Sequence, residues 1–531
     1  MKISLHRKLF VPIVALATVA AGLVPAAAAT DSTIRPVRQC ADLVRDFDVP
    51  HAMTHVKSAT VVAAGAEAEH CDVRGTIEPN IGFQLKLPTS TYRGRYLPYG
   101  CGGFCGYLQA PSFPQCGPGA GDAAVAATDD GHLAPPENPF DTTWGKNNQA
   151  ARDDYFFRAP HVLSKASKRI IQAFYGKAPT KSYFSGCSNG GREALLLAQR
   201  YPDDFDGIIA GAPANHYGPI VVLQAWLARH PIPDVKLPVL HNAVMAECDQ
   251  LDGLTDDQID DPRACDYDPG KLRCDGPDQP TCLTQPEVDN VRALYAGPTD
   301  AAGRKLYPGG GETYGSELAW RGWITPIPEF GGSISAGLAD NGLRHLAYPI
   351  GTPHSSLAEF KFTVPELRRL TPELLKANAM SLDLRDFRRS GGKLIIWHGA
   401  NDEAIPFDGT LDYWQRLTKG VPQSWARLFV VPSMYHCGDG SGLTSFDPFK
   451  ELIGWVERGK APDKVIAERR DQQGNVTRTR PVFPYPLRAK YDGTGSTDDA
   501  ANFVPFRPKP ANDRIHWAGE DLYAKPGPTA P

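Results

Sequence analysis

Hydrophobic and polar residues alternate along residues 159–213 in the order that α/β proteins show. An amphipathic stretch predicts a helix over Ala159–Tyr175, and a buried-strand pattern follows over Ser182–Gly186. A second helix over Arg192–Arg200 and a second strand over Gly207–Ala212 continue the alternation. Because consecutive strands that alternate with helices pair in parallel, this order predicts a mostly parallel sheet.

The same pattern returns in the last third of the chain. The apolar runs Lys393–Trp397 and Arg427–Val431 predict two more buried strands, and Leu411–Leu417 predicts a helix between them. The tail from about residue 480 is rich in proline, glycine and aspartate, and we expect it to wrap the surface.

The stretch 215–390 interrupts the alternation with prolines, clustered acidic residues and a glycine-rich run at 308–311. An insertion at the carboxyl ends of parallel strands lies over the place where such sheets bind ligands. We therefore predict a catalytic domain made of residues 30–214 and 391–531, with residues 215–390 inserted as a lid domain.

The first residues have the composition of a secretory signal peptide. A basic start, an apolar run over 9–24 and an alanine-rich stretch up to residue 29 predict that residues 1–29 are removed on export. An uncleaved anchor helix is the alternative, but the apolar run is short for a membrane span and contains Pro12. We expect a secreted protein without a membrane partner.

Charge argues against a nucleic-acid partner. The formal net charge is −4, and residues of both signs are scattered without a basic stripe or a polybasic face. The expected partner is a small or neutral molecule. Chain length leaves the oligomeric state open.

Cysteine usage favours disulfides, because an exported protein with eleven cysteines matures in an oxidising compartment. The odd number leaves at least one thiol unpaired or paired between chains. A zinc site at Cys101, Cys105 and Cys116 is disfavoured because no fourth ligand follows at a suitable spacing. The pairing of these three cysteines remains open.

The strongest chemical motif is the nucleophile elbow Gly186-Cys187-Ser188-Asn189-Gly190. Glycine is needed two positions on either side of the serine because the nucleophile occupies a strained turn between a strand and a helix. Both flanking elements are predicted here, which favours Ser188 as a nucleophile over an ordinary glycine turn.

A serine nucleophile requires a general base and an acid that orients it, in the chain order serine, acid, histidine. Asp402 follows the strand at 393–397, and His436 follows the strand at 427–431. We predict His436 as the base and Asp402 as the orienting acid. Glu403 is the alternative acid, with Asp402 capping a turn.

An oxyanion hole in such an enzyme combines the amide after the nucleophile with one from an earlier loop. The first is predicted to be Asn189. Gly102 and Gly103, in the glycine-rich loop at 99–106, are the candidates for the second. The alternative is a structural turn held by the cysteines of that loop.

With these motifs the chain resembles the tannase and feruloyl esterase family. The likeness rests on Cys187-Ser188, Asp402 and His436-Cys437, and it extends to the segments 155–161, 174–176, 205–208 and 489–495. The resemblance implies an α/β-hydrolase core with a large inserted lid, and hydrolysis of phenolic acid esters. It also implies a disulfide between Cys187 and Cys437. Further expected disulfide cysteines are Cys40, Cys71, Cys248, Cys265, Cys274 and Cys282.

The resemblance further implies a structural Ca²⁺ ion in the lid. Its ligands would be the carboxylates of Asp249, Asp252 and Asp256 with the backbone oxygens of Leu254 and Gln258, a set of hard donors that suits calcium. Without the resemblance, a solvated acidic loop would explain the segment. No organic cofactor is expected.

Together these observations predict a secreted serine carboxylic ester hydrolase that acts on aromatic, phenolic acid esters such as feruloyl or galloyl esters through an acyl-enzyme. The alternatives are an esterase for terephthalate-type monoesters, an acyltransferase or peptidase with the same triad, and a non-catalytic binding protein. The preferred acid and alcohol are left open, because the selective contacts would be scattered over 215–390.

Overall fold

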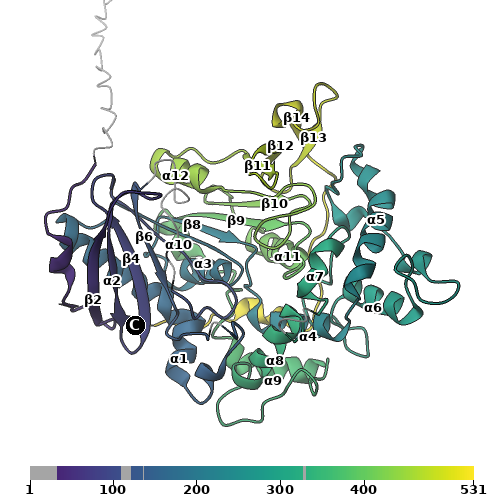
Figure 1. Cartoon of the computed structure of the whole chain (residues 1–531), viewed down its shortest axis with the longest axis horizontal. Coiled ribbons are helices and arrows are strands. Elements are labelled where there is room, and N and C mark those ends of the chain that lie inside the picture. The colour runs from purple at the N-terminus through teal and green to yellow at the C-terminus, as the bar shows by residue number, and fades with distance from the viewer. Residues whose placement is uncertain (1–32, 109, 111–120, 136, 327–330, 531) are drawn as a thin grey trace, which may run out of the picture. The chain divides into compact units, whose positions relative to one another are not determined.

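In the computed structural model, ten strands of the described residues form one sheet in the order β1-β2-β3-β4-β6-β5-β7-β8-β9-β10 (Figure 1). The structure describes residues 33–108, 110, 121–135, 137–326 and 331–530, so the predicted signal peptide lies outside them. Strands β1 to β4 pair antiparallel, as do β4 and β6. Every later pair in the order, from β6–β5 to β9–β10, is parallel. The predicted α/β class with a mostly parallel sheet is confirmed.

The strands of this sheet are β1 (Asp46–Phe47), β2 (Thr54–Val62), β3 (His70–Ile77), β4 (Ile81–Pro88), β5 (Arg95–Pro98), β6 (Ala123–Thr128), β7 (Lys181–Cys187), β8 (Gly207–Gly211), β9 (Lys393–Gly399) and β10 (Ala426–Val431). Two small antiparallel pairs follow, formed by β11 (Val465–Arg470) with β12 (Val476–Val482) and by β13 (Arg488–Tyr491) with β14 (Phe503–Phe506).

The helices are α1 (Gln149–Asp153), α2 (Ala159–Tyr175), α3 (Asn189–Arg200), α4 (Tyr217–Arg229), α5 (Leu237–Cys248), α6 (Gln285–Ala296), α7 (Trp320–Trp323), α8 (Ile334–His345), α9 (Val364–Leu374), α10 (Arg385–Arg389), α11 (Asp408–Leu417) and α12 (Phe449–Arg458).

The apolar runs of the parallel strands are continuous because both faces of the sheet are covered. Successive side chains of a strand point to opposite faces, so Leu394 and Ile396 of β9 join one hydrophobic core, while Ile395 and Trp397 join another on the opposite face. Helices α2 and α3 contribute to the first core and α12 to the second.

The stretch 215–390 contains the helices α4 to α10, and Figure 1 shows α4 to α9 gathered beside the strands β8 to β10. It has a hydrophobic cluster of its own, in which Leu223, Leu240, Val291 and Trp320 from four helices are completely buried. Other residues of the stretch, among them Leu343 of α8 and Leu370 of α9, join the core on the α2 side of the sheet, so the stretch also packs into that core.

The expectation that the tail wraps the surface is wrong for its last part. Trp517, Leu522 and Tyr523 are buried and join the core on the α2 side of the sheet. The Tyr523 hydroxyl donates to Asp412 at 2.6 Å and lies 2.8 Å from Nε2 of His216. Composition favoured an irregular surface tail, but these aromatic residues bury enough apolar area to anchor it.

Candidate active site

Ser188 occupies the sharp turn between β7 and α3, with φ 61° and ψ −121°. A non-glycine residue with positive φ is strained and persists only where the surroundings enforce it. The flanking glycines do so: a Cβ on Gly186 would lie 2.5 Å from the backbone of Gly190, and one on Gly100 would lie 2.5 Å from Gly190 Cα. Glycine at these positions therefore lets the turn close and lets the loop at 99–106 approach it.

Asp402 and His436 lie together after β9 and β10, as the sequence predicts. Asp402 Oδ2 is 2.8 Å from His436 Nδ1, and the aspartate is completely buried. Burial raises the pKa of Asp402, but the charge of His436 and hydrogen bonds from both neighbouring histidines outweigh it, so the pKa lies below its ordinary value. The aspartate is thus ionised and able to orient the imidazole.

The pKa of His436 is the result of two opposing effects. Burial lowers this pKa, but the charge and the hydrogen bond of Asp402 raise it by more, so the pKa lies above the ordinary value of 6.5. Such a histidine is a stronger base than a free imidazole, which is what proton abstraction from a serine hydroxyl requires.

Glu403, the alternative acid, contacts the backbone of His436 instead of its ring. Its Oε2 accepts the His436 backbone N–H at 3.0 Å. Burial and the neighbouring charge of Asp402 raise the pKa of Glu403 to about 7. The geometry favours Asp402 as the orienting acid and leaves Glu403 the task of holding the histidine loop.

A disulfide joins Cys187 and Cys437, whose Cα atoms are 5.9 Å apart. It connects the residue before Ser188 to the residue after His436. Within the described part of the chain no hydrogen bond joins Ser188 Oγ to His436, but both side chains line one cavity of about 610 Å³. The disulfide therefore crosslinks the two loops on which the nucleophile and the base are carried.

The predicted oxyanion donors differ in how they are engaged. Asn189 is the first residue of α3, so its backbone N–H has no acceptor within the helix. Gly102 already donates its N–H to the Tyr107 hydroxyl at 3.1 Å. Gly103 lines both cavities beside Ser188, which makes it the better placed of the two glycines.

A buried network that the sequence did not predict supports these donors. The Tyr155 hydroxyl donates to the Gly103 carbonyl at 3.1 Å and lies 2.6 Å from the Tyr217 hydroxyl. Arg192 Nε donates to the Asn189 side-chain oxygen at 2.7 Å. The only sequence signal was that Tyr155 and Arg192 lie in or next to the motifs. The network itself could not be predicted, because most of its contacts join segments that are distant in sequence.

Two cavities meet at Ser188. The cavity of about 610 Å³ opens past the glycine loop, and a narrower one of about 90 Å³ extends between α4 and the loop after Asp402. Trp323 and Leu338 line both, and the Trp323 indole lies 5.5 Å from the His436 ring between centroids. The remaining described residues of the narrower cavity are mostly apolar or aromatic and include Phe104, Ala214, Tyr217, Ile220, Val221, Gln224, Ala404 and Ile405.

Four further disulfides join the described cysteines in the pairs Cys40–Cys71, Cys101–Cys105, Cys248–Cys265 and Cys274–Cys282. Cys116 lies outside the described residues. The sulfurs of Cys101 and Cys105 lie with carboxylate oxygens of Asp130 and Glu193 in one cluster, all within 4.8 Å of one another. Because both sulfurs are in a disulfide bond, they do not act as thiolate ligands here.

The acidic segment expected to hold calcium contains carboxylates that are close enough to raise one another's pKa. Burial, followed by the charges of Asp260, Asp256 and Asp249, raises the pKa of Asp252 to about 7. Oδ1 of Asp256 is buried without a hydrogen-bond partner, although Oδ2 accepts from Arg480 at 2.7 Å. The unsatisfied oxygen of Asp256 suits a hard divalent cation, but Asp249 accepts three backbone N–H groups, and the carboxylate oxygens of this segment are not gathered into one ligand cluster of the described residues.

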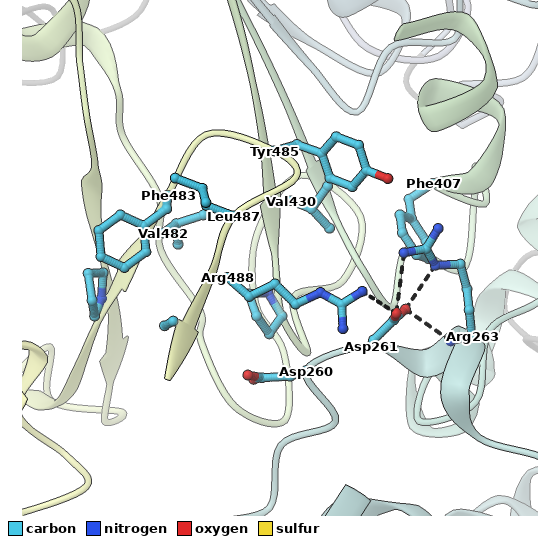
Figure 2. Close-up of a pocket in the computed structure, with 13 residues that line it drawn as sticks. Asp260, Asp261, Arg263, Phe407, Val430, Val482, Phe483, Tyr485, Leu487 and Arg488 are labelled. Carbon is cyan, nitrogen blue, oxygen red and sulfur yellow. Dashed lines mark hydrogen bonds and ion pairs between the residues drawn. The ribbon is translucent and has the colours of Figure 1, made fainter. Parts of the chain in front are cut away.

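A small cavity of about 30 Å³ lies between the end of the acidic segment, at Asp260 and Asp261, and the chain around β12 and β13 (Figure 2). None of Ser188, Asp402 and His436 lines it. Asp261 accepts hydrogen bonds from both Arg263 and Arg488 across it. These paired charges indicate a structural contact between two segments.

Comparison with known proteins decides the class. The model of the family described as tannase and feruloyl esterase matches residues 64–505, which include all three candidate triad residues. The chain belongs to this family. It is a carboxylic ester hydrolase with the α/β-hydrolase fold, as the sequence resemblance predicted.

Relatives and solved structures within the family are similar over most of the chain. A mono(2-hydroxyethyl) terephthalate hydrolase of Piscinibacter sakaiensis is 32% identical, covering 87% of this chain and 90% of that protein. A probable feruloyl esterase B-1 of Aspergillus terreus is 30% identical, covering 76% and 79%. The crystal structure of feruloyl esterase B from Aspergillus oryzae superimposes with a TM-score of 0.72 at 25% identity, covering 87% and 98%.

Proposed function

We propose that this esterase hydrolyses esters of uncharged aromatic acids, such as feruloyl and galloyl esters, through an acyl-serine intermediate. The observation that carries the proposal is the short hydrogen bond between Asp402 and His436 beside a strained Ser188 at the junction of two mostly apolar cavities. In the triad of serine esterases, a buried ionised acid orients an imidazole base, and the base accepts the proton of a serine hydroxyl.

In the proposed reaction, Ser188 Oγ attacks the ester carbonyl carbon while His436 Nε2 accepts the hydroxyl proton. The backbone N–H groups of Asn189 and Gly103 donate to the oxyanion that forms. When the intermediate collapses, the bond to the alcohol oxygen breaks and His436 returns the proton to it. Water, deprotonated by the same nitrogen, then attacks the acyl-serine and releases the acid.

The lack of cationic side chains among the described residues that line the cavities favours esters of uncharged aromatic acids over terephthalate-type monoesters. No lysine or arginine is among the described residues that line either cavity at Ser188. The residues outside the described ranges after position 33, at 109, 111–120, 136, 327–330 and 531, contain none either. A free carboxylate buried there would lack a cationic partner, which is costly.

The likeness to a terephthalate-monoester hydrolase keeps that substrate class as the second candidate. A matched pair of substrates separates the two. Monomethyl terephthalate and methyl 4-carbamoylbenzoate have nearly the same shape, but only the first carries a negative charge. We expect kcat/KM for the neutral amide to exceed that for the carboxylate by roughly tenfold to a hundredfold, the loss typical of an unpaired charged group.

The experiment that tests the whole proposal combines this pair with methyl ferulate, methyl gallate and an amide of ferulic acid. Ser188→Ala should lose ester hydrolysis and labelling by a fluorophosphonate, with an unchanged melting temperature. Hydrolysis by Ser188→Ala above a few per cent of wild type would exclude the acyl-serine. Faster cleavage of the amide than of the ester would favour a peptidase.

We also propose that the protein is secreted and holds one structural Ca²⁺ ion. Five disulfides among the described residues and the leader-like residues 1–29 support export. Among the described residues, none of the helices has the length and apolar character needed to span a bilayer. Asp249, Asp252, Asp256 and nearby backbone oxygens would hold the ion, which would stabilise the acidic segment without taking part in the reaction.

A further inference from the structure

A second histidine contacts the same carboxylate oxygen of the candidate acid as the base does. His398 lies near the end of β9 and is completely buried. Its Nε2 is 3.2 Å from Asp402 Oδ2 and 2.8 Å from the carbonyl oxygen of Ile405, and its Nδ1 is 2.9 Å from the hydroxyl of Thr410 in α11. Both ring nitrogens therefore have a partner.

These partners fix where the proton of the ring lies. The carbonyl oxygen of Ile405 only accepts hydrogen bonds, so Nε2 carries the proton and donates. In the neutral ring, Nδ1 is unprotonated and accepts from the Thr410 hydroxyl. Nε2–H donates to the Ile405 carbonyl, and the same nitrogen lies 3.2 Å from the Asp402 carboxylate.

The Asp402 carboxylate accepts three N–H groups and contacts a fourth. Oδ1 accepts from the backbone of Ala404 at 2.9 Å and of Ile405 at 2.8 Å, Oδ2 accepts from His436 at 2.8 Å, and Nε2 of His398 lies 3.2 Å from Oδ2. His398 thus binds the acid and the backbone of the loop that carries it at the same time. Ala404 and Ile405 of this loop also form a wall of the narrower cavity.

We propose that His398 is a positioning residue, which fixes Asp402 so that its Oδ2 meets His436 Nδ1. The inference rests on the proposed function of Asp402 and His436, and adds a residue to that machinery. A carboxylate held by its own loop alone can rotate about its χ angles. A ring anchored at its far end by α11 removes that freedom, and a misplacement of about 1 Å at such a site costs about a hundredfold in rate.

Other titratable groups face this pair and must be kept apart from it in a test. Burial lowers the pKa of His216 to about 3, so His216 is neutral near pH 7, and burial raises the pKa of Glu312 well above its ordinary value. Burial also raises the pKa of Tyr307, which stays protonated. Glu403, with a pKa of about 7, is the group that titrates in the range of interest.

Two amide substitutions form a matched pair for the test. The side-chain nitrogen of His398→Gln replaces Nε2 and still reaches Asp402, whereas that of His398→Asn replaces Nδ1 and does not. We expect His398→Gln to keep kcat within about threefold of wild type. His398→Asn should lower kcat by roughly tenfold to a hundredfold with KM within about twofold.

The pH profile gives a readout that a purely structural role would not move. Asp402 without the His398 donor binds protons more strongly and stabilises the His436 imidazolium more, so the acid limb of kcat/KM should shift to higher pH in His398→Asn alone. Repeating the profile in a Glu403→Gln background removes the titration of that neighbour. The shift should remain.

Equal kcat and equal acid limbs in the Gln and Asn variants would overturn the inference, as would a wild-type profile in His398→Asn. Should His398→Asn fail to fold, Thr410→Val provides the second test. It removes the partner of Nδ1, so the ring loses its anchor on α11 and can rotate away from Asp402. An unchanged kcat and profile would refute the role. If Ser188→Ala keeps activity, the proposed function itself fails, and this outcome is independent of the His398 variants.

Discussion

Replacing Cys187 and Cys437 together by alanine should affect both stability and turnover. The disulfide closes a loop with a sequence separation of 250 residues. The chain-entropy model gives about 5.5 kcal/mol for such a loop, an upper value because native disulfides often contribute less. For about 500 residues the unfolding entropy near the midpoint is about 1 kcal/mol/K, so the melting temperature should fall by about 5 °C.

The disulfide between Cys274 and Cys282 provides a matched control. Its sequence separation is 8, for which the same model gives about 2.5 kcal/mol and a decrease of about 2 °C. Neither cysteine lines the cavities at Ser188. Removing this pair should therefore leave kcat unchanged.

Steady-state kinetics and calorimetry on both double variants decide the matter. Loss of the bridge between Cys187 and Cys437 should lower kcat about a hundredfold, with KM within about twofold, because the nucleophile and base loops can drift apart. A wild-type kcat in this variant, or a melting temperature no lower than that of the control, would refute the reasoning.

Three further predictions concern charge. Activity should fall as pH drops through the raised pKa of His436. In Asp402→Asn the acid limb should move to lower pH, because burial, which lowers that pKa, is then opposed only by the charge of Glu403, and kcat should fall about 10⁴-fold. Chelation should lower the melting temperature, because calcium at a concentration of about a hundred times its Kd stabilises the folded state by about 2.7 kcal/mol. Asp249→Asn should lose this response, whereas Asp257→Asn, at an exposed position, should keep it. Leu338→Arg should raise kcat/KM for monomethyl terephthalate roughly tenfold relative to methyl 4-carbamoylbenzoate, and Leu338→Gln should not; equal ratios would argue against the charge argument.

The core around the elbow was predictable because its signals are local. The helix predicted over Ala159–Tyr175 has these bounds in the structure, and the predicted strand at 393–397 extends by two residues as β9. Both elements carry continuous or periodic apolar residues. Asp402 and His436 were predictable because a serine nucleophile requires an acid and a histidine, which follow it in that order along the chain.

The parts that escaped prediction depend on contacts between distant residues. Tyr155 and Arg192 meet the oxyanion loop and the elbow only after folding, and no sequence periodicity announces such a network. From sequence alone, a histidine that follows an apolar strand, such as His398, looks like a core residue. Its role is visible only once Asp402, Ile405 and Thr410 are placed around it.

The buried residues Trp517, Leu522 and Tyr523 make completion of the fold wait until this part of the chain has been synthesised. Tyr523 bonds to Asp412 of α11, the helix whose Thr410 also anchors His398. A chain still lacking its last residues has the triad in sequence but leaves this side of its core open. A nascent or truncated form ending near residue 510 should therefore expose apolar surface and be cleared by proteases, and a purification tag is better tolerated when a spacer separates it from Tyr523.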